Sequence, residues 1–275
     1  MALEIAVLAS GSSGNAIYLN EGNITLLIDA GLSGKEIERR MKKIARNPAD
    51  LDALLITHEH GDHIKGAGVL ARRYNIPIYA TEGTWKAAEK KLGKLKSRQK
   101  RLTKERWQLG GLTIESFPIP HDAAEPVGYT FSNEEIKVGL ATDMGYITSE
   151  ITEALQGLDC LLLEANHDLD LLREGSYPVR LKRRIRSEGG HLSNEETARW
   201  LPEILASSRS NYPVVFLSHL SAENNRPELA YLTVKNSLKE AGYNIGDDLI
   251  LKCAPRREPG KLLVLDNLCQ EGEKS

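Results

Sequence analysis

The chain has 275 residues, of which 41% are hydrophobic and 27% are charged, and its formal net charge is −2. These values lie near the averages of globular proteins and exclude disordered, collagen-like and disulfide-stapled chains. At about 150 residues per domain, the length allows one large domain or two fused halves. No apolar run approaches the roughly 20 residues that cross a bilayer, so we expect no membrane partner.

The cysteines and the N-terminal residues indicate a compartment. Cys160, Cys253 and Cys269 stand far apart and form no Cys-x-x-Cys pair, which argues against a disulfide framework and a thiolate zinc site. The acidic Glu4 lies where a signal peptide would be basic. We therefore expect a cytoplasmic protein, while its oligomeric state is left open.

The first part of the chain is predicted to form short strands. Residues 3–9, 15–19, 24–28 and 52–57 are short apolar runs, and Ser-Gly and Glu-Gly-Asn turns separate the first three. Residues 33–45 instead show a helical period. The sequence therefore predicts hairpin strands followed by a surface helix that lies on a sheet.

The helix over 33–45 has its own signals, because Ser33 is a good N-cap and Ile37, Met41 and Ile44 recur at helical spacing. Further strands are predicted at 77–80, 112–117, 127–132, 136–142, 159–164 and 213–218, and further helices near 82–91, 149–156, 194–205 and 227–241. This order predicts helices layered over two β-sheets, an α/β (α+β) fold. We expect one domain over 1–270 and a frayed tail over 271–275.

Two segments are strongly basic. Ten lysines and arginines lie between Lys86 and Arg106, and five more lie between Arg180 and Arg186. Such clusters attract phosphates, but solvated helix faces produce the same pattern. Charge alone leaves both interpretations open.

The strongest motif is His58-Glu-His60-Gly-Asp62-His63, which directly follows an apolar predicted strand. In an extended loop, alternate residues share a face, so His58 and His60 can reach one ion. Asp62 and His63 then turn toward a second ion. Imidazole and carboxylate ligands suit zinc, and also manganese or iron.

This motif resembles the signature of the metallo-β-lactamase superfamily, and further pieces follow in the family's order. These are the SGSSGN turn at 10–15, Asp29-Ala-Gly, His121 after Phe-Pro-Ile-Pro, Ala-Thr-Asp143 and Ser-His219-Leu-Ser. The resemblance covers nearly the whole chain. It implies an αββα metallo-β-lactamase sandwich with two divalent metal ions at one edge of the sheets.

The resemblance also implies a ligand set. It places His58, His60 and His121 on one ion and Asp62, His63 and His219 on the other, with Asp143 bridging both. Each of these ligands follows an apolar predicted strand, where a side chain is rigidly held. Asp29 is expected to support a ligand or to form a turn instead of binding metal, and the turn at 10–15 is either a plain hairpin turn or an anion-facing one.

His191 is a candidate general acid. It precedes a predicted helix that Ser193 and Glu196 begin with a capping box, so loop packing would also explain it. In the RNase Z branch of the superfamily, a similar His-x-Ser/Thr element precedes the last histidine ligand, and its histidine gives a proton to the leaving group. His191 matches that position.

A second histidine segment, Asn166-His167-Asp168, follows another apolar strand. A helix cap with a bystander histidine is the plain explanation. Together with the segments around His191 and His219, however, it resembles the YycJ/WalJ (VicX) group, whose members are regarded as 5′-to-3′ exonucleases on DNA. We therefore predict that Asn166, His167 and Ser193 bind substrate.

Departures from related families narrow the function. His219 follows Asp143 by only 76 positions, too few for the large extra domain of RNase J and cleavage-factor nucleases. No RNase Z-type arm is evident, unless the basic segment at 86–106 serves as one. Asp143 stands where several true β-lactamases of this fold carry a cysteine, which favours ester or phosphodiester chemistry.

The sequence therefore predicts a two-metal phosphodiester hydrolase, foremost a 5′-3′ exonuclease on DNA. The nucleophile would be a hydroxide that bridges the metals, zinc or manganese, with Asp62 orienting it. DNA is favoured over RNA as partner. Two alternatives stay open: a hydrolase of small phosphodiesters or glyoxalase II-like thioesters, and a non-catalytic regulatory protein with structural metals.

Overall fold

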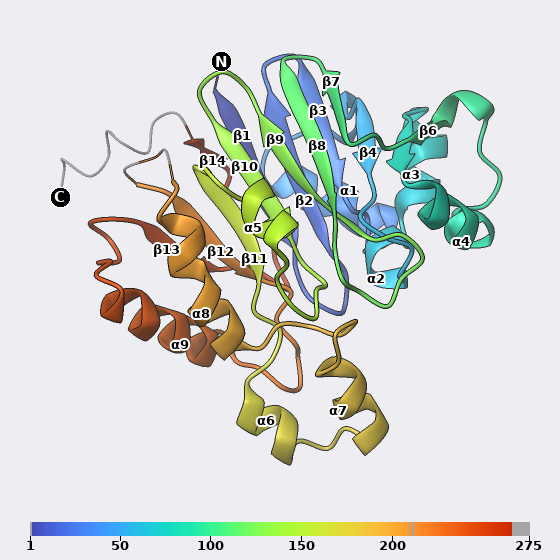
Figure 1. The fold of residues 1–275 in the computed structure, drawn as a ribbon. Helices are drawn as coiled ribbons and strands as arrows, with labels where there is room; N and C mark the ends of the chain where they lie inside the picture. The colour runs from blue at the N-terminus through green and yellow to red at the C-terminus, as the bar shows by residue number, and fades with distance from the viewer. Residues whose placement is uncertain (1, 209, 211, 266–275) are drawn as a thin grey trace. The chain divides into compact units, whose positions relative to one another are not determined.

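The computed structural model describes residues 2–208, 210 and 212–265 (Figure 1). Cys269 and the predicted tail at 271–275 lie outside the described residues. Of the helices in the described ranges, none combines the length and the apolar character that a membrane crossing requires.

The first sheet is built mostly from the N-terminal part of the chain. Its strands are β1 (Leu3–Ala9), β2 (Ala16–Glu21), β3 (Ile24–Ile28), β4 (Ala53–Leu55), β5 (Ile78–Ala80), β6 (Lys100–Leu102) and β14 (Leu263–Val264). They lie in the order β14-β1-β2-β3-β4-β5-β6. Strands β1 to β3 pair antiparallel, whereas β3 to β6 run parallel. The carboxyl ends of β3 and β4 therefore meet at one edge.

The second sheet has the same number of strands. They are β7 (Arg106–Leu109), β8 (Leu112–Pro118), β9 (Val127–Ser132), β10 (Lys137–Ala141), β11 (Cys160–Glu164), β12 (Val214–Ser218) and β13 (Ile250–Cys253), in the order β13-β12-β11-β10-β9-β8-β7. Strands β10 to β13 are parallel, and β9 pairs antiparallel with β10. The carboxyl ends of β10, β11 and β12 share an edge, as in any parallel sheet.

Helices connect these strands. They are α1 (Gly34–Lys43), α2 (Gly61–Ile64), α3 (Ala67–Tyr74), α4 (Glu82–Leu92), α5 (Ser149–Ala154), α6 (Leu169–Glu174), α7 (Val179–Ile185), α8 (Asn194–Leu205) and α9 (Pro227–Glu240), with short 3-10 helices η1 (Pro48–Asp50) and η2 (Ser97–Gln99). The Ser33 hydroxyl caps α1 by accepting from the backbone N–H of Glu36. The predicted N-cap of this helix is therefore confirmed.

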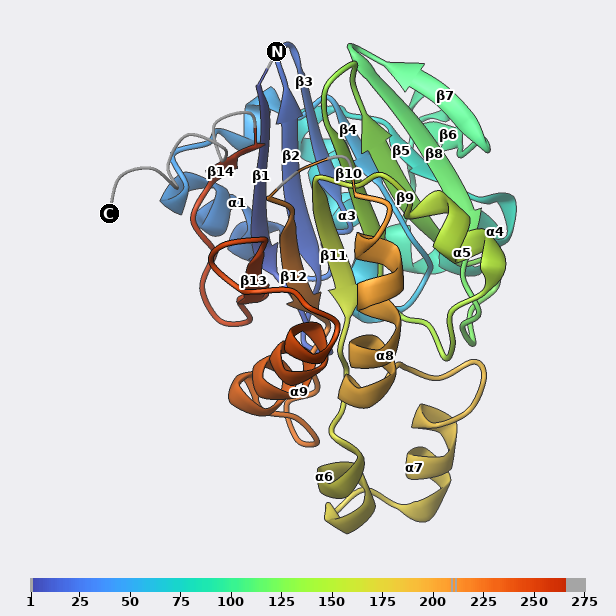
Figure 2. The same ribbon diagram turned by 60° about the vertical axis from the view of Figure 1, so that its left-hand side comes forward.

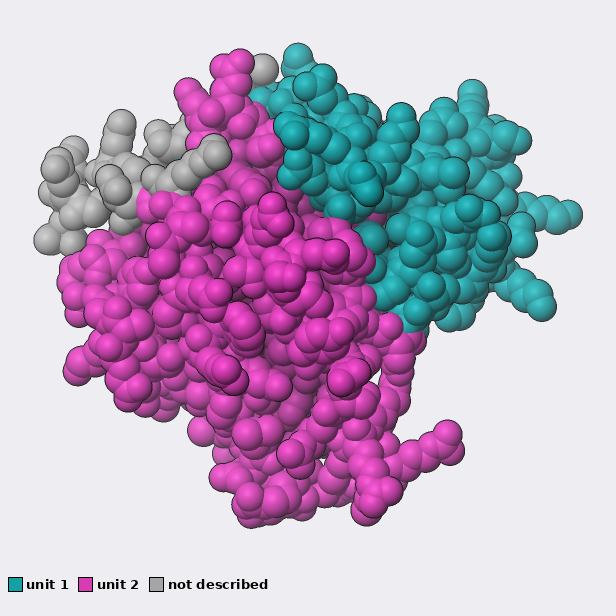
Figure 3. Space-filling view, viewed as in Figure 1, with its two compact units in different colours: residues 1–116, 123–127, 255–266 teal, residues 117–122, 128–254, 267–275 magenta. Residues whose placement is uncertain are grey.

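The chain divides into two compact units, which Figure 3 colours separately. Unit 1 comprises 1–116, 123–127 and 255–266, and unit 2 comprises 117–122, 128–254 and 267–275. The single domain expected over 1–270 stays a prediction.

Unit 1 has its own core. Ile37 and Met41 of α1 and Leu70 of α3 pack with Leu27 and Leu54 of the first sheet, and all five are fully buried. The spacing of Ile37 and Met41 is the helical period seen in the sequence. One face of α1 is therefore fixed on the sheet.

Unit 2 has a second core under α5, α8 and α9, which cover strands β10 to β13 (Figure 2). Leu201 of α8 and Val234 of α9 pack with Leu161, Leu163 and Val215 of the sheet. In both views α6 and α7 lie beyond the carboxyl ends of β11 and β12 (Figures 1 and 2). These two short helices therefore stand beside the edge at which the parallel strands end.

Most predicted elements are present. Strands 3–9, 24–28 and 127–132 and helix 194–205 agree with β1, β3, β9 and α8 to the residue. The strand predicted over 52–57 is shorter, because β4 ends at Leu55 and the chain then turns into the histidine loop. The sequence analysis missed several short elements: β6, β7, β13, β14, α2, α3, α6, α7, η1 and η2.

Candidate metal centre

Four predicted ligands gather within unit 1. His58 follows β4, His60 is the N-cap residue of α2, and Asp62 and His63 lie in that helix. The ring centroids of His58 lie 4.6 Å from His60 and 4.1 Å from His63. The His63 Nε2 is 3.7 Å from Asp62 Oδ2. A short helix directly after an extended loop thus concentrates three imidazoles and a carboxylate.

Asp29 supports these predicted ligands, which is one of the two roles that the sequence predicted for it. Its carboxylate accepts from the Thr57 backbone N–H and hydroxyl at 2.9 Å each, and it lies 2.7 Å from His63 Nδ1. An ionised carboxylate can only accept, so the proton of His63 resides on Nδ1. The Thr57 hydroxyl also lies 3.0 Å from His58 Nδ1. Asp29 and Thr57 therefore orient both rings, the usual role of groups behind metal-binding histidines.

The turn at 10–15 braces the same loop. The Asn15 backbone N–H donates to the Asp62 carbonyl at 2.8 Å, and its side-chain amide lies 3.0 Å from His63 Nε2. A Cβ on Gly31 would come within 1.6 Å of the Asp62 carbonyl oxygen, so only glycine fits. The plain turn has a structural function here, namely to hold the ligand loop.

Unit 2 gathers a second set at the carboxyl edge of its parallel strands. Asp143 follows β10, Glu164 ends β11 and His219 follows β12. Together with His191 they offer ligand atoms that lie within 4.8 Å of one another. Asp143, Glu164 and His219 are almost fully buried. This edge therefore holds a His/Asp/Glu cluster that could bind a metal ion.

Glu164 is the residue that sequence reasoning missed. Its Oε1 lies 2.8 Å from His191 Nδ1 and 2.9 Å from His219 Nδ1, and its Oε2 accepts from the Met144 backbone N–H at 2.7 Å. The carboxylate is fully buried, which by itself would raise its pKa. The two histidines more than offset this, and the pKa lies well below the ordinary value.

Glu164 thereby sets the tautomers of both rings. A carboxylate accepts hydrogen bonds, so His191 and His219 each carry a proton on Nδ1 and present Nε2 away from Glu164. The signal for this residue was present in the sequence. Glu164 ends the apolar run Cys-Leu-Leu-Leu-Glu164, and an acidic side chain is unusual in a buried strand. A buried carboxylate is normally paired with cationic or hydrogen-bonding groups, so the sequence indicates that Glu164 has such partners.

His121 joins this set within unit 2. Its Nδ1 lies 3.1 Å from the Gly190 carbonyl oxygen and its Nε2 lies 3.9 Å from Asp143 Oδ1. Burial lowers the pKa of His121 below its ordinary value, although Asp143 acts in the opposite direction. A neutral imidazole is the form that binds metal.

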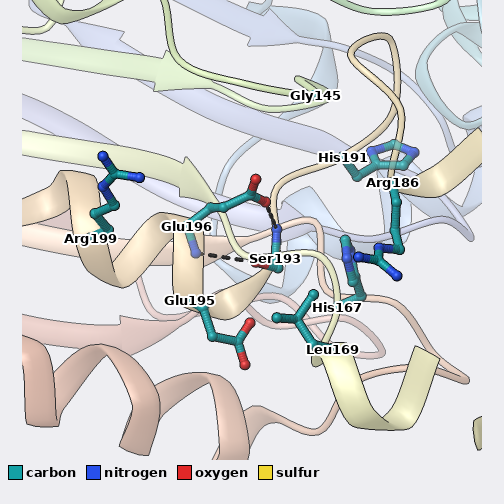
Figure 4. Close-up of a pocket in the computed structure, with 9 residues that line it drawn as sticks. All are labelled: Gly145, His167, Leu169, Arg186, His191, Ser193, Glu195, Glu196 and Arg199. Carbon is teal, nitrogen blue, oxygen red and sulfur yellow. Dashed lines mark hydrogen bonds between the residues drawn. The ribbon is translucent and has the colours of Figure 1, made fainter. Parts of the chain in front are cut away.

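The predicted substrate-binding residues have different surroundings. Asn166 turns its amide to the His219 carbonyl, at 2.8 Å, and so supports that loop. Ser193 caps α8 because its hydroxyl accepts from the Glu196 N–H, and the Glu196 carboxylate accepts from the Ser193 N–H, so the predicted capping box is present (Figure 4). His167 is 1% exposed. Burial lowers the pKa of His167 to about 4, which leaves the ring neutral at neutral pH.

His167 and Ser193 line a pocket of about 370 Å³ beside His191 (Figure 4). Its other walls come from Gly145, the start of α6, the end of α7 and the first two turns of α8. Two backbone bonds, from Asn166 N–H to the Leu192 carbonyl and from Asn194 N–H to the His167 carbonyl, join the two loops that carry these residues. The pocket wall is therefore held as one piece.

The basic segments are partly paired. In the first, the Lys86, Lys100 and Arg106 side chains form salt bridges with glutamates at 2.6, 3.6 and 3.3 Å. In the second, Arg184 forms a two-pronged bond with Asp122. Lys94 and Lys96 form no salt bridge with any residue that the structure describes, and Lys94 is exposed.

Comparisons with known proteins agree with these observations. A family model described as a beta-lactamase superfamily domain matches residues 25–210. The chain is 47% identical over 247 residues to the exodeoxyribonuclease WalJ of Streptococcus pneumoniae, covering 88% of this chain and 91% of that protein. It is 40% identical over 264 residues to the exodeoxyribonuclease YycJ of Bacillus anthracis, covering 95% and 99%.

Solved structures agree on the fold. The metallo-β-lactamase-fold protein YhfI from Bacillus subtilis has a TM-score of 0.72 at 16% identity, covering 96% of this chain and all of YhfI, or 100%. Two mixed sheets flanked by helices and this likeness confirm the predicted α/β sandwich. The chain belongs to the β-lactamase superfamily and has the metallo-β-lactamase fold.

Proposed function

We propose that this chain is a two-metal-dependent phosphodiester hydrolase of the cytoplasm, a 5′-3′ exonuclease that acts on DNA. One observation carries the proposal: the chain has every ligand of the family motif, and it is 40% identical over 95% of its length to a protein named as an exodeoxyribonuclease. Asp143 in place of a cysteine supports ester chemistry over lactam hydrolysis.

The seven predicted ligands form the proposed metal set. His58, His60 and His121 would hold one ion and Asp62, His63 and His219 would hold the other, with Asp143 shared between them. The donor set fits this role, because imidazoles oriented by carboxylates and carboxylate oxygens without thiolates suit zinc and manganese. When bound, two such ions neutralise phosphate charge and supply a hydroxide nucleophile at neutral pH.

The chain's own residues would divide the remaining work. Asp62 orients the attacking water and takes its proton. His191 acts as the doubly protonated imidazolium: it gives its Nε2 proton to the leaving oxygen and keeps its Nδ1 proton toward Glu164, 2.8 Å away. His167 and Ser193 contact the strand in the pocket beside His191. Asn166, the third proposed substrate-binding residue, also supports the His219 loop, because its side-chain amide donates to the His219 carbonyl.

The test uses the full chain loaded with manganese or zinc and end-labelled single- and double-stranded DNA and RNA. We expect mononucleotides to be released from the 5′ end of DNA, and we expect His58→Ala to abolish the release while the chain stays folded by circular dichroism. Intact nucleic acid together with hydrolysis of a glutathione thioester would instead favour the glyoxalase II-like alternative.

A further inference from the structure

The pocket of Figure 4 combines opposite charges in a defined arrangement. Arg186, which follows α7, lies at one side next to His167 and His191, and Arg199 of α8 lies at the other side. Ser193, Glu195 and Glu196 lie between them, and the Glu196 carboxylate accepts from the Ser193 N–H (Figure 4). The pocket thus has a cation at each side and two carboxylates between them.

Both arginines are available for a ligand. Their side chains are exposed, and neither forms a salt bridge with a residue in the described part of the chain. The Arg199 Cζ lies over the Trp200 ring, 5.8 Å from its centroid. The planar guanidinium group matches phosphate oxygens in a two-pronged geometry.

Two buried polar atoms also lack partners within the residues described. They are Nδ1 of His167, whose side chain is 1% exposed, and Oε2 of Glu195. A buried polar group without a hydrogen bond costs about 1–3 kcal/mol, so such groups in native proteins usually await a ligand or water. His167 and Glu195 both line the pocket.

Size and charge together select the occupant. A volume of about 370 Å³ lies within the range of small-molecule sites and exceeds what a single phosphate fills. A nucleotide within a strand has a phosphate on each side and an uncharged sugar and base between them. Glu195 in the middle would repel a phosphate, but it can accept from a base amino group. Leu169, 39% exposed, offers an apolar contact.

We propose that this pocket holds one nucleotide of the substrate strand, with the phosphates on its two sides bound by Arg186 and Arg199 and the phosphate at the Arg186 side also contacted by His167. This inference rests on the proposed function for its biological meaning. It adds the substrate subsite next to the proposed general acid, and it assigns binding roles to Arg186, Arg199 and Glu195.

The test is equilibrium binding, which needs no turnover. Isothermal titration calorimetry of the full metal-loaded chain would compare deoxyadenosine 3′,5′-bisphosphate with deoxyadenosine 5′-monophosphate. We expect the bisphosphate to bind about ten times more tightly or better, because it engages both arginines. Arg186→Met and Arg199→Met should each weaken bisphosphate binding by about ten- to a hundredfold, the range for a lost charge-assisted bond.

Controls separate the pocket from general charge and from folding. Lys239→Met removes one exposed cation from α9 of the same unit, outside the pocket, and should leave the bisphosphate affinity unchanged. His167→Gln should weaken binding, with thermal unfolding measured because this side chain is buried. If the His167 variant does not fold, the two arginine variants still test the proposal, because both arginine side chains are exposed.

Two results would overturn the proposal. One is equal affinity of the wild-type chain for the two ligands, and the other is arginine variants that bind like Lys239→Met. A chain that degrades DNA yet gives either result refutes the pocket alone. A chain that binds the bisphosphate as expected but cleaves no nucleic acid refutes the proposed function and keeps the pocket.

Discussion

Three site residues adopt a backbone conformation that side chains other than glycine rarely take. Asp29, Asp143 and His219 have φ angles of 58°, 62° and 55°. Each stands just after a strand, at the carboxyl edge of its sheet. Strained conformations of this kind persist only where packing enforces them, and they cluster at functional sites. These conformations destabilise the folded backbone locally, and the surrounding packing keeps the three side chains directed into the site at the strand ends.

His191→Ala tests the proposed general acid. We expect turnover on DNA to fall by about two to four orders of magnitude, the usual contribution of a positioned acid, with the metal content unchanged. The loss should shrink on a nitrophenyl phosphodiester, whose leaving oxygen needs no proton. Steady-state rates on both substrates decide the matter. Equal losses on both would assign His191 to positioning, and wild-type rates would make it a packing residue.

Glu164→Gln tests the buried carboxylate as a positioning residue. Glutamine keeps the shape but cannot accept from two Nδ1–H groups and the Met144 N–H in the same way, so the rings of His191 and His219 lose their fixed tautomer. We expect a fall in kcat of about a hundredfold or more with little change in KM.

A readout independent of rate accompanies this prediction. The ¹⁵N chemical shifts of His191 and His219 should show Nδ1 protonated in the wild type and a mixture of tautomers in Glu164→Gln. Unchanged shifts together with an unchanged kcat would show that Glu164 has no positioning role.

At the scale of elements, helix α1 carries an acid-sensitive contact. Glu36 bonds with Arg39 at 2.7 Å and with Arg40 at 2.8 Å. The hydrogen bond from Arg39 is the largest of the effects that lower the pKa of Glu36 to about 2. Arg40 is buried and also donates to the carbonyls of Leu8 and Arg256.

Glu36→Gln should therefore change stability in a pH-dependent way. The folded pKa lies below the ordinary value of 4.5, so the ionised carboxylate contributes stability above about pH 4.5 and loses it as the pH falls toward about 2. For a partly exposed pair we expect about 1 kcal/mol at pH 7. Urea unfolding of both proteins between pH 7 and pH 3 should show the gap closing, whereas a gap that stays constant with pH refutes the contact.

The basic segment at 86–106 is a second test at this scale. Lys94→Glu with Lys96→Glu should weaken DNA binding similarly for all sequences. It should also lower the slope of log K against log salt by about 2, at about 0.9 per lost phosphate contact. Lys239→Glu with Lys252→Glu, an equal charge reversal elsewhere, is the control. If both pairs bind DNA alike in fluorescence anisotropy, the segment is an ordinary solvated surface.

The elements also show what the sequence could predict. Strands β1, β3 and β9 were predictable because each is a short apolar run between clear turns, and α8 because its capping box marks the first residue. Helix α3 was not predictable from the sequence, because Gly66 and Gly68 flank its first residue and no side chain caps it. Strand β6 is a wholly exposed Lys-Arg-Leu segment, which takes its conformation from pairing with β5.

The candidate site also contains residues that the sequence predicts and residues that only the folded structure reveals. A motif of four close residues, His58 to His63, is visible in the sequence because the ligands are local. The role of Glu164 depends on β11 lying between β10 and β12, which no local pattern states. Arg186 and Arg199 belong to the same class, because only the folded chain brings the end of α7 and the second turn of α8 to one pocket.

At the scale of the whole molecule, the sequence and the family agree on a metal-dependent enzyme. Unit 1 concentrates three imidazoles and a carboxylate, and unit 2 concentrates three imidazoles and two carboxylates. Both sets lie at strand ends and both have carboxylates that orient the histidines. A structural ion usually has four ligands, and the two sets together offer more candidate ligands than that. We therefore propose two ions per chain.

The most direct measurement is a titration of the metal-stripped chain with manganese, in which bound metal and release of nucleotides from 5′-labelled DNA are followed together. We predict no hydrolysis without metal, full hydrolysis only as the second ion per chain binds, and none at any metal concentration in His58→Ala. Hydrolysis at full rate in the presence of a chelator, or a chain that binds no divalent ion, would contradict a two-metal nuclease.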